Sequence, residues 1–166
     1  MAVATNRPSC GGADFARERG IPLGELPQKL YASAEERDIA MRDFLKSHGV
    51  ELVVDAGYDR IHTEPFVAAF SGRIINVHPS LLPDFAGGMD AVEQALRSGV
   101  QATGATVHVV TGDLDAGPIL LQEQVPILAG DTVESLRGRI HEAEYRILPQ
   151  AVRLMEARLA KSPAVG

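Results

Sequence analysis

The sequence predicts an α/β domain in which a mostly parallel, twisted sheet is flanked by helices. Short apolar strands alternate with amphipathic helices along the chain, which is the pattern of this fold class. The runs Leu52–Val54 and Arg73–Val77 are rich in β-branched residues, as expected of parallel strands buried on both faces. The chain has 166 residues and shows neither an internal repeat nor a linker, so we expect one domain over residues 1–166.

The first third of the chain predicts short strands and two helices. The short elements are a strand over 2–5, a helix over 13–19 and a strand over 22–26. The second helix has clearer ends. Ser33 is its expected N-cap, Glu36 completes a capping box three residues later, and Gly49 closes the helix. A strand over 52–54 is expected to follow.

The rest of the chain continues the alternation and ends in a long helix. The expected elements are a helical turn over 64–70, a strand over 73–77, a helix over 91–97 ended by Gly99, and strands over 103–110 and 119–126. Asp131 is the expected N-cap of the last helix, with Glu134 at the capping-box position. Apolar residues from Val133 to Met155 recur at three- and four-residue steps, which predicts one buried helix face.

Composition excludes several kinds of protein. Sixteen basic and twenty-two acidic residues give a net charge of −6, which argues against nucleic acid as a partner. No apolar run approaches the roughly 18 residues of a membrane span, so no membrane partner is expected. Cys10 is the only cysteine, so we expect no internal disulfide, no cysteine-based zinc site and a reducing cytoplasm as the setting. The five histidines lack close ligand-type spacing, so no metal is expected.

Polar side chains follow a buried strand at the point where ligands bind in open parallel sheets. Asn76 offers an amide donor, and His78 is the side chain best suited to proton transfer near neutral pH. The turn-rich loop 111–118 adds two carboxylates, Asp113 and Asp115, and one of them near His78 would raise the pKa of the imidazole. Taken alone, the same residues are also explained as loop stabilisers and turn formers.

Longer stretches around these residues resemble the folate-dependent formyltransferases, and among them the glycinamide ribonucleotide formyltransferases. The stretches are 75–83 (Ile-Asn-Val-His-Pro-Ser-Leu-Leu-Pro), 104–108 (Gly-Ala-Thr-Val-His) and 114–119 (Leu-Asp-Ala-Gly-Pro-Ile). Their order, spacing and flanking residues match the family over nearly the whole chain, about Val3 to Leu159. The resemblance implies a Rossmann-like formyltransferase fold and a catalytic set of Asn76, His78 and Asp115.

The resemblance also implies a reaction. The amine of glycinamide ribonucleotide attacks the formyl carbon of 10-formyltetrahydrofolate and creates a tetrahedral oxyanion. Protonated His78 and the amide of Asn76 stabilise that oxyanion, which is worth several kcal/mol in a dry site. Asp115 keeps His78 charged and accepts the proton lost by the amine, directly or through water. No metal is required.

Binding residues are implied in the same way. For the folate they are Tyr58, Asp59, Arg60, Ile61, Thr111, Gly112, Asp113 and Leu114, and for the ribonucleotide they are Pro79, Gly87 and Glu144. Asp55, Asp59 and His62 stand where the family usually has apolar residues, which either alters folate binding or reflects drift on a loop surface. Arg139 matches a basic residue of the family, and His108 is either a packed neighbour of the site or a participant.

The start of the chain departs from the family pattern. The family normally begins with an apolar strand and a Gly-x-Gly-Ser-Asn loop whose backbone N–H groups bind the substrate phosphate. This sequence begins at the equivalent of the second strand, so the expected fold is N-terminally truncated. A mis-assigned start, a non-catalytic paralogue or a second chain that supplies the strand would each explain the difference.

The predicted activity is formyl transfer to glycinamide ribonucleotide, a small molecule, in purine synthesis by a monomer or homodimer. Three alternatives remain: transfer to another amine, hydrolysis of 10-formyltetrahydrofolate, and a truncated paralogue without turnover.

Overall fold

The computed structural model of the chain describes residues 1–87 and 90–161, and its backbone divides into two compact units. The N-terminal unit comprises Met1–Val53 and Arg60–Ser71, and the C-terminal unit comprises Val54–Asp59 and Gly72–Gly166. The division into compact units does not decide whether the chain is one domain, so the single domain expected over residues 1–166 stays a prediction. No helix in the described part of the chain combines the length and the apolar character that a membrane crossing demands.

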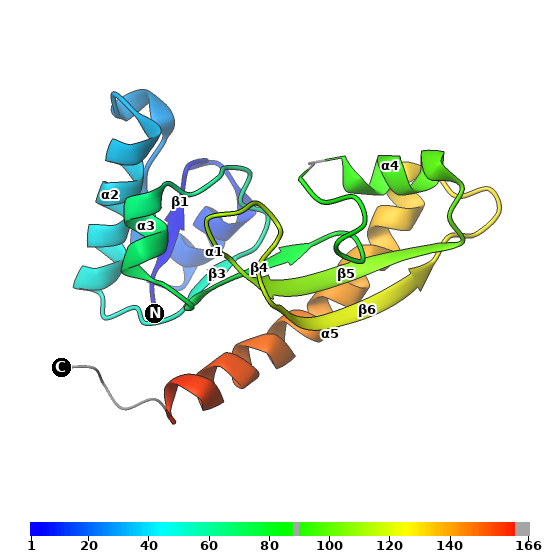
Figure 1. The fold of residues 1–166 in the computed structure, drawn as a ribbon. Helices are drawn as coiled ribbons and strands as arrows, with labels where there is room; N and C mark the ends of the chain where they lie inside the picture. The colour runs from blue at the N-terminus through cyan, green and yellow to red at the C-terminus, as the bar shows by residue number, and fades with distance from the viewer. Residues whose placement is uncertain (88–89, 162–166) are drawn as a thin grey trace. The chain divides into compact units, whose positions relative to one another are not determined.

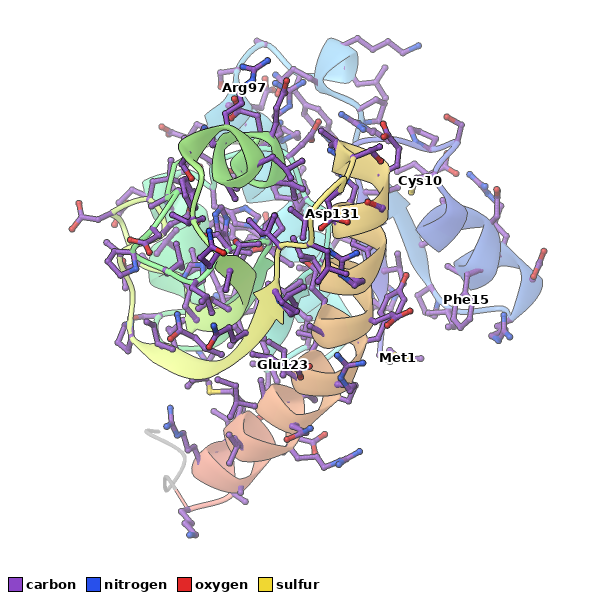
Figure 2. The ribbon with its side chains drawn as sticks, turned by 90° about the vertical axis from the view of Figure 1, so that its right-hand side faces the viewer. Met1, Cys10, Phe15, Arg97, Glu123 and Asp131 are labelled. Carbon is purple, nitrogen blue, oxygen red and sulfur yellow. The ribbon has the colours of Figure 1, made fainter. Side chains whose placement is uncertain are left out.

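The N-terminal unit contains a two-stranded parallel sheet and three α-helices. Its elements are β1 (Val3–Thr5), α1 (Gly11–Glu18), β2 (Leu23–Glu25), the 3-10 helix η1 (Gln28–Leu30), α2 (Ala34–Ser47) and α3 (Glu64–Ala69). Strand β1 pairs with β2 in the register Val3↔Leu23. Cys10 is the N-cap residue of α1, and Figure 2 labels it near Phe15 of the same helix. The expected short elements of this region are therefore confirmed to within a few residues.

The predicted ends of α2 are confirmed, but one hydrogen bond of the predicted capping box is shifted by one residue. The Ser33 hydroxyl accepts a hydrogen bond from the backbone N–H of Glu36 at 3.0 Å. The Glu36 carboxylate accepts from the backbone N–H of Ala32 at 2.7 Å, one residue before the N-cap position that a capping box would satisfy. Gly49 has a φ of 65°, so it follows the helix in the left-handed conformation that glycine adopts without a steric penalty.

A buried ion pair links three segments of this unit. Arg37 donates to Asp38 Oδ1 from Nε at 3.1 Å and from Nη2 at 2.7 Å, and to Gln28 Oε1 from Nη1 at 2.9 Å. The other Asp38 oxygen accepts from the backbone N–H of Thr63, the N-cap residue of α3, at 2.7 Å. All three guanidinium nitrogens and both carboxylate oxygens are therefore hydrogen-bonded.

The C-terminal unit is built on a sheet with the strand order β3-β4-β5-β6. The elements are β3 (Val53–Asp55), whose first residue ends the first segment of the N-terminal unit, β4 (Ile74–His78), α4 (Ala91–Ser98), β5 (Ala102–Val109), β6 (Ile119–Pro126) and α5 (Val133–Leu159). Figure 1 shows β5 and β6 side by side with α5 running along them. The α/β class is confirmed, and the predicted strand 119–126 matches β6 at both ends.

The sheet is mixed, which corrects the expectation of a mostly parallel one. Strand β5 runs antiparallel to both β4 and β6. Only residues 110–118 connect β5 to β6, and a parallel crossover needs roughly a dozen residues or more, so this pair can only form a hairpin. The apolar run that indicated a parallel strand over 73–77 lies in β4, which pairs antiparallel with β5, so such a run does not encode strand direction.

Helix α5 buries one stripe of apolar side chains and begins one residue later than predicted. The buried residues are Leu136, Ile140, Ala143, Ile147, Ala151 and Met155, at the expected helical spacing. The N-cap is Thr132 in a capping box with Ser135, so the assignment to Asp131 and Glu134 was wrong. Asp131 lies just before the helix (Figure 2) and accepts hydrogen bonds from Leu128 N, Ser135 Oγ and Arg139. Chiefly through Arg139, this environment holds the pKa of Asp131 well below its usual range.

Candidate functional site

Two rows of polar side chains cross the sheet of the C-terminal unit. In the strand register Asn76 of β4 lies opposite His108 of β5, and His78 lies opposite Thr106. Residues directly opposite each other in an antiparallel pair project from the same face, and side chains two positions apart along a strand share that face. The four side chains therefore belong to one face of β4 and β5. In the sequence, Gly104, Thr106 and His108 occupy alternate positions of the expected strand, which places them on one face. The predictions did not use this pattern.

His78 is held on both sides of its ring. Its Nε2 lies 3.2 Å from the carbonyl oxygen of Phe85, and a carbonyl can only accept, so Nε2 carries the hydrogen in this contact. Its Nδ1 lies 3.5 Å from Asp115 Oδ2, and the side chains of His78 and Asp115 are only 7% and 8% exposed. The structure therefore brings these two predicted catalytic residues together.

Asp115 is placed by a tight loop between β5 and β6. A Cβ at Gly117 would lie 1.7 Å from the carbonyl oxygen of Val109, so only glycine allows the two strand ends to approach this closely. Asp115 itself has a φ of 51°, in a region that side chains other than glycine rarely adopt. Backbone of this kind is held by its surroundings and is concentrated at functional sites. The backbone N–H of Gly87 donates to Asp115 Oδ2 at 2.9 Å.

His108 completes the cluster and fixes the amide of Asn76. Burial lowers the pKa of His108, so the ring is neutral near pH 7. Its Nδ1 lies 3.1 Å from the carbonyl oxygen of Val109 and therefore carries the single hydrogen. Its Nε2 then accepts from Asn76 Nδ2 at 3.2 Å, and it also lies 3.5 Å from Asp115 Oδ1. The amide nitrogen of Asn76 keeps a second hydrogen, and no described residue accepts it.

A cavity of about 350 Å³ lies between β4 and α5 of the same unit. Val77, Pro79, His141, Glu144 and Tyr145 are among its lining residues. Val77 projects from the face of β4 opposite to that of Asn76 and His78, because side chains alternate along a strand. Burial raises the pKa of Glu144 to about 7. No described residue donates a hydrogen bond to this carboxylate, and the nearest cation partner is His141 Nε2 at 4.0 Å.

The predicted substrate-binding residues thus fall into two places. Pro79 and Glu144 line the cavity, whereas Gly87 contacts the carboxylate of Asp115. Arg139, which matches a basic residue of the family, binds Asp131 and the carbonyl oxygen of Pro126. Its guanidinium therefore anchors the start of α5.

The predicted folate-binding residues lie in three exposed or half-buried segments. Thr111, Gly112, Asp113 and Leu114 form an exposed stretch of the loop that carries Asp115, and the Thr111 hydroxyl donates to the carbonyl of Asp113 at 3.3 Å. Tyr58 and Asp59 are half-buried in the C-terminal unit, and Arg60 and Ile61 are exposed in the N-terminal unit. The binding roles of all these residues stay predictions.

The unusual polar residues near the predicted folate segment have separate surroundings. Asp55 is half-buried at the end of β3, and its charge favours the protonated form of His108. His62 stacks on Phe66 with ring centroids 4.1 Å apart, inside the N-terminal unit. Within residues 1–87 and 90–161, no group of three or more His, Cys, Asp or Glu side chains is arranged to hold a metal ion.

The class of protein follows from the fold and from comparison with known families. Residues 1–152 match the formyl transferase family. The chain therefore belongs to the formyl transferase family.

Individual relatives of the chain are named for glycinamide formylation or for purine biosynthesis. The chain is 38% identical over 158 residues to phosphoribosylglycinamide formyltransferase of Haemophilus influenzae, covering 95% of this chain and 74% of that protein. It is 44% identical over 155 residues to the trifunctional purine biosynthetic protein adenosine-3 of Bos taurus, covering 93% of this chain. The chain spans only 15% of the length of that trifunctional relative.

A solved structure supports the same assignment. Glycinamide ribonucleotide transformylase 1 from Symbiobacterium toebii superposes with a TM-score of 0.90 at 46% identity, covering 93% of this chain and 73% of that chain. The formyltransferase fold expected from the sequence is therefore confirmed.

Proposed function

We propose that this chain transfers a formyl group from 10-formyltetrahydrofolate to the amine of glycinamide ribonucleotide, a step of purine biosynthesis. The observation that carries the proposal is the cluster of His78, Asp115 and Asn76, completed by His108, in a chain of the formyl transferase family. An acyl transfer needs donors for an oxyanion and an acceptor for a proton, and this cluster contains both.

The chemistry assigns each side chain a task. The amine nitrogen forms a bond to the formyl carbon, and the carbonyl oxygen becomes an oxyanion. The second amide hydrogen of Asn76 and the Nε2–H of His78, which is shared with the Phe85 carbonyl, stabilise that oxyanion. Asp115 accepts the proton that the amine loses, directly or through water, and the bond from carbon to the folate nitrogen breaks as that nitrogen takes up a proton. His108 stays neutral and accepts one amide hydrogen of Asn76, which leaves the second hydrogen for the substrate.

The cavity beside α5 fits the sugar of the ribonucleotide. The Glu144 carboxylate has no hydrogen-bond donor among the described residues, and it lines a space of about 350 Å³. Ribose hydroxyls donate hydrogen bonds, and such bonds to a carboxylate are about twice as strong as those between neutral groups. Glu144 therefore binds the ribose, and Pro79 and Val77 form an apolar wall of the same space.

The folate binds next to the loop between β5 and β6. The stretch Thr111–Leu114 offers exposed backbone groups for the polar pterin ring, and Leu114 is 50% exposed, so it can pack against an aromatic ligand. Tyr58 and Asp59 of the same unit supply the second binding segment. The protein acts in the cytoplasm as a monomer or homodimer.

A turnover assay with three acceptors tests the proposal. The purified chain is mixed with 10-formyltetrahydrofolate and glycinamide ribonucleotide, a second primary amine, or buffer alone, and the deformylated folate is followed spectroscopically. We expect rapid release only with the ribonucleotide, and loss of that release in His78→Ala. Equal release in buffer alone would make the protein a hydrolase. Folate binding without release in any mixture would identify a paralogue without turnover.

A further inference from the structure

The row that begins at His78 continues to the edge strand of the sheet. Thr106 of β5 lies opposite His78 on one side and opposite Gln122 of β6 on the other. The three side chains therefore cross the sheet on one face. Thr106 is fully buried, whereas Gln122 is exposed at the surface. The predictions made from the sequence include neither Thr106 nor Gln122.

The hydrogen bonds of Thr106 and Gln122 connect this row to the loop after β4 (residues 79–87). The Thr106 hydroxyl donates to the carbonyl of Ser80 at 2.7 Å and accepts from the backbone N–H of Leu82 at 3.0 Å. Gln122 Nε2 donates to Thr106 Oγ1 and to the carbonyl of Leu82, both at 2.9 Å. A hydroxyl has one hydrogen and two lone pairs, and an amide nitrogen has two hydrogens, so both groups are saturated.

The loop then returns to the imidazole of His78. The Ser80 hydroxyl donates to the carbonyl of Asp84 at 2.5 Å, and Asp84 N donates to the carbonyl of Leu81 at 2.9 Å. The next residue is Phe85, whose carbonyl oxygen lies 3.2 Å from His78 Nε2. Phe85 has a φ of 57°, a conformation that a bulky side chain keeps only when its surroundings hold it.

We propose that Gln122 is a positioning residue for His78, acting through Thr106 and the loop after β4. Its amide donates to Thr106 and to Leu82, and Thr106 in turn binds Ser80 and Leu82. These hydrogen bonds fix the backbone path of residues 83–85. That path keeps the Phe85 carbonyl in contact with His78 Nε2. This contact selects the ring form with hydrogen on Nε2 and leaves Nδ1 facing Asp115. The inference rests on the proposed function, because positioning matters only if His78 acts on a substrate.

The exposure of Gln122 separates this role from core packing. An exposed glutamine on an edge strand contributes little to the hydrophobic core, and its replacement leaves no cavity. One of its two amide hydrogens nevertheless binds the Leu82 carbonyl of the loop, and the other binds the hydroxyl of Thr106. Gln124 lies two residues further along β6, is also exposed, and pairs with Gly104, so it provides a matched control position.

Two substitutions at each position test the proposal. Gln122→Met keeps the length of the side chain and removes both donors, whereas Gln122→Lys restores N–H donors on a different shape. The controls are Gln124→Met and Gln124→Lys. One readout is the kinetics of the full chain with both substrates. The other is the nitrogen NMR spectrum of the His78 ring, which reports which ring nitrogen carries the hydrogen and needs no turnover.

We expect Gln122→Met to lower kcat roughly tenfold with little change in KM, because small displacements of a reacting group reduce the rate of the chemical step. The His78 spectrum should change from hydrogen on Nε2 to a mixture of both ring forms. Gln122→Lys should recover most of kcat and of the spectrum, and both Gln124 variants should match the parent.

An unchanged His78 spectrum in Gln122→Met overturns the proposal, and so does a fall in kcat that Gln122→Lys fails to repair. If the parent chain has no transferase activity, the proposed function fails, whereas the NMR comparison still decides whether Gln122 positions His78.

Discussion

Each unit of the molecule buries a cluster of charged and polar side chains, and the two clusters differ in how completely they are hydrogen-bonded. In the N-terminal unit, Arg37 and Asp38 are 2% and 0% exposed and meet at 2.7 Å. In the C-terminal unit, His78 and Asp115 are 7% and 8% exposed, yet they lie 3.5 Å apart. Burial is therefore nearly the same, whereas the contact in the second cluster is longer than a hydrogen bond.

The difference distinguishes a cluster whose hydrogen bonds are all made from one with groups left to bind a ligand. All three guanidinium nitrogens of Arg37 donate within the N-terminal unit, and both oxygens of Asp38 accept there. A ligand finds no unused group at that site. Asp115 Oδ1 instead lies 3.5 Å from the neutral ring of His108, and Asn76 keeps an amide hydrogen that no described residue accepts. Donors and acceptors that the protein leaves without a hydrogen bond in a buried site are available to a reacting substrate.

The largest expected effect is on kcat, when the imidazole of His78 is removed. We expect His78→Ala to lower kcat by roughly 10³- to 10⁴-fold, since it removes an oxyanion donor and a proton-transfer group together. The melting temperature should also fall, because His78 is buried and alanine leaves a cavity in its place, so kcat is expressed per folded molecule. Steady-state kinetics and a thermal melt of the same sample measure both. A large loss of stability with normal turnover per folded molecule would place His78 among structural residues.

The second-largest effect is expected in the N-terminal unit, where a substitution should reduce stability and leave kcat unchanged. Arg37→Met removes one partner of a buried ion pair and leaves the Asp38 charge with only the Thr63 N–H. Breaking such a pair destabilises a protein by about 3–5 kcal/mol. Urea unfolding should show this loss, while kcat per folded molecule stays near that of the parent. A stable Arg37→Met variant with reduced kcat would contradict the structural assignment of this cluster.

A smaller effect concerns the carboxylate in the cavity. Burial raises the pKa of Glu144 to about 7 in the folded chain, compared with about 4.3 for an exposed glutamate. The folded state therefore holds a proton that the unfolded chain releases between these pH values, and stability falls as pH rises through this range. We expect Glu144→Gln to exceed the parent in unfolding free energy by about 2 kcal/mol at pH 8 and to equal it at pH 4.

Chemical denaturation at the two pH values measures this difference. A stability gain of the same size at pH 4 would show that the carboxylate is not the cause.

The smallest effect separates Thr132 from Asp131 at the start of α5. Thr132 is the N-cap, so Thr132→Ala should cost about 1 kcal/mol of stability. Asp131 accepts from Leu128, Ser135 and Arg139, so Asp131→Ala should cost more than Thr132→Ala. Paired thermal melts rank the two variants. The reverse order would restore the N-cap assignment that the sequence suggested.

Local patterns predicted the elements well, and tertiary pairing accounts for what they missed. The alternation and turn residues located β6, and the apolar spacing located the buried face of α5. Asp131 and Thr132 are both good N-caps, so sequence alone had no physical basis for choosing between them. The row from His78 to Gln122 depends on strand register across three strands, and that register is set by pairing between distant segments.

The catalytic set was located by family resemblance, and its geometry needed the structure. A histidine and an aspartate separated by 36 intervening positions carry no local sign that they meet, yet Gly117 and the left-handed Asp115 bring the carboxylate to His78. The burial that raises the pKa of Glu144 was equally invisible, because a glutamate on a helix usually faces solvent.

One paired measurement tests most directly whether the two clusters differ as described. Asp38→Asn and Asp115→Asn make the same change in the two buried sites, and asparagine tolerates the positive φ of Asp115. Kinetics and unfolding free energy are measured for both variants and the parent. We expect Asp38→Asn to lose about 3 kcal/mol of stability and to keep its kcat. We expect Asp115→Asn to lose less than about 1 kcal/mol, with a kcat at least roughly 100-fold lower than that of the parent. Equal losses of stability in the two variants, with kcat retained in Asp115→Asn, would contradict the distinction between the two clusters.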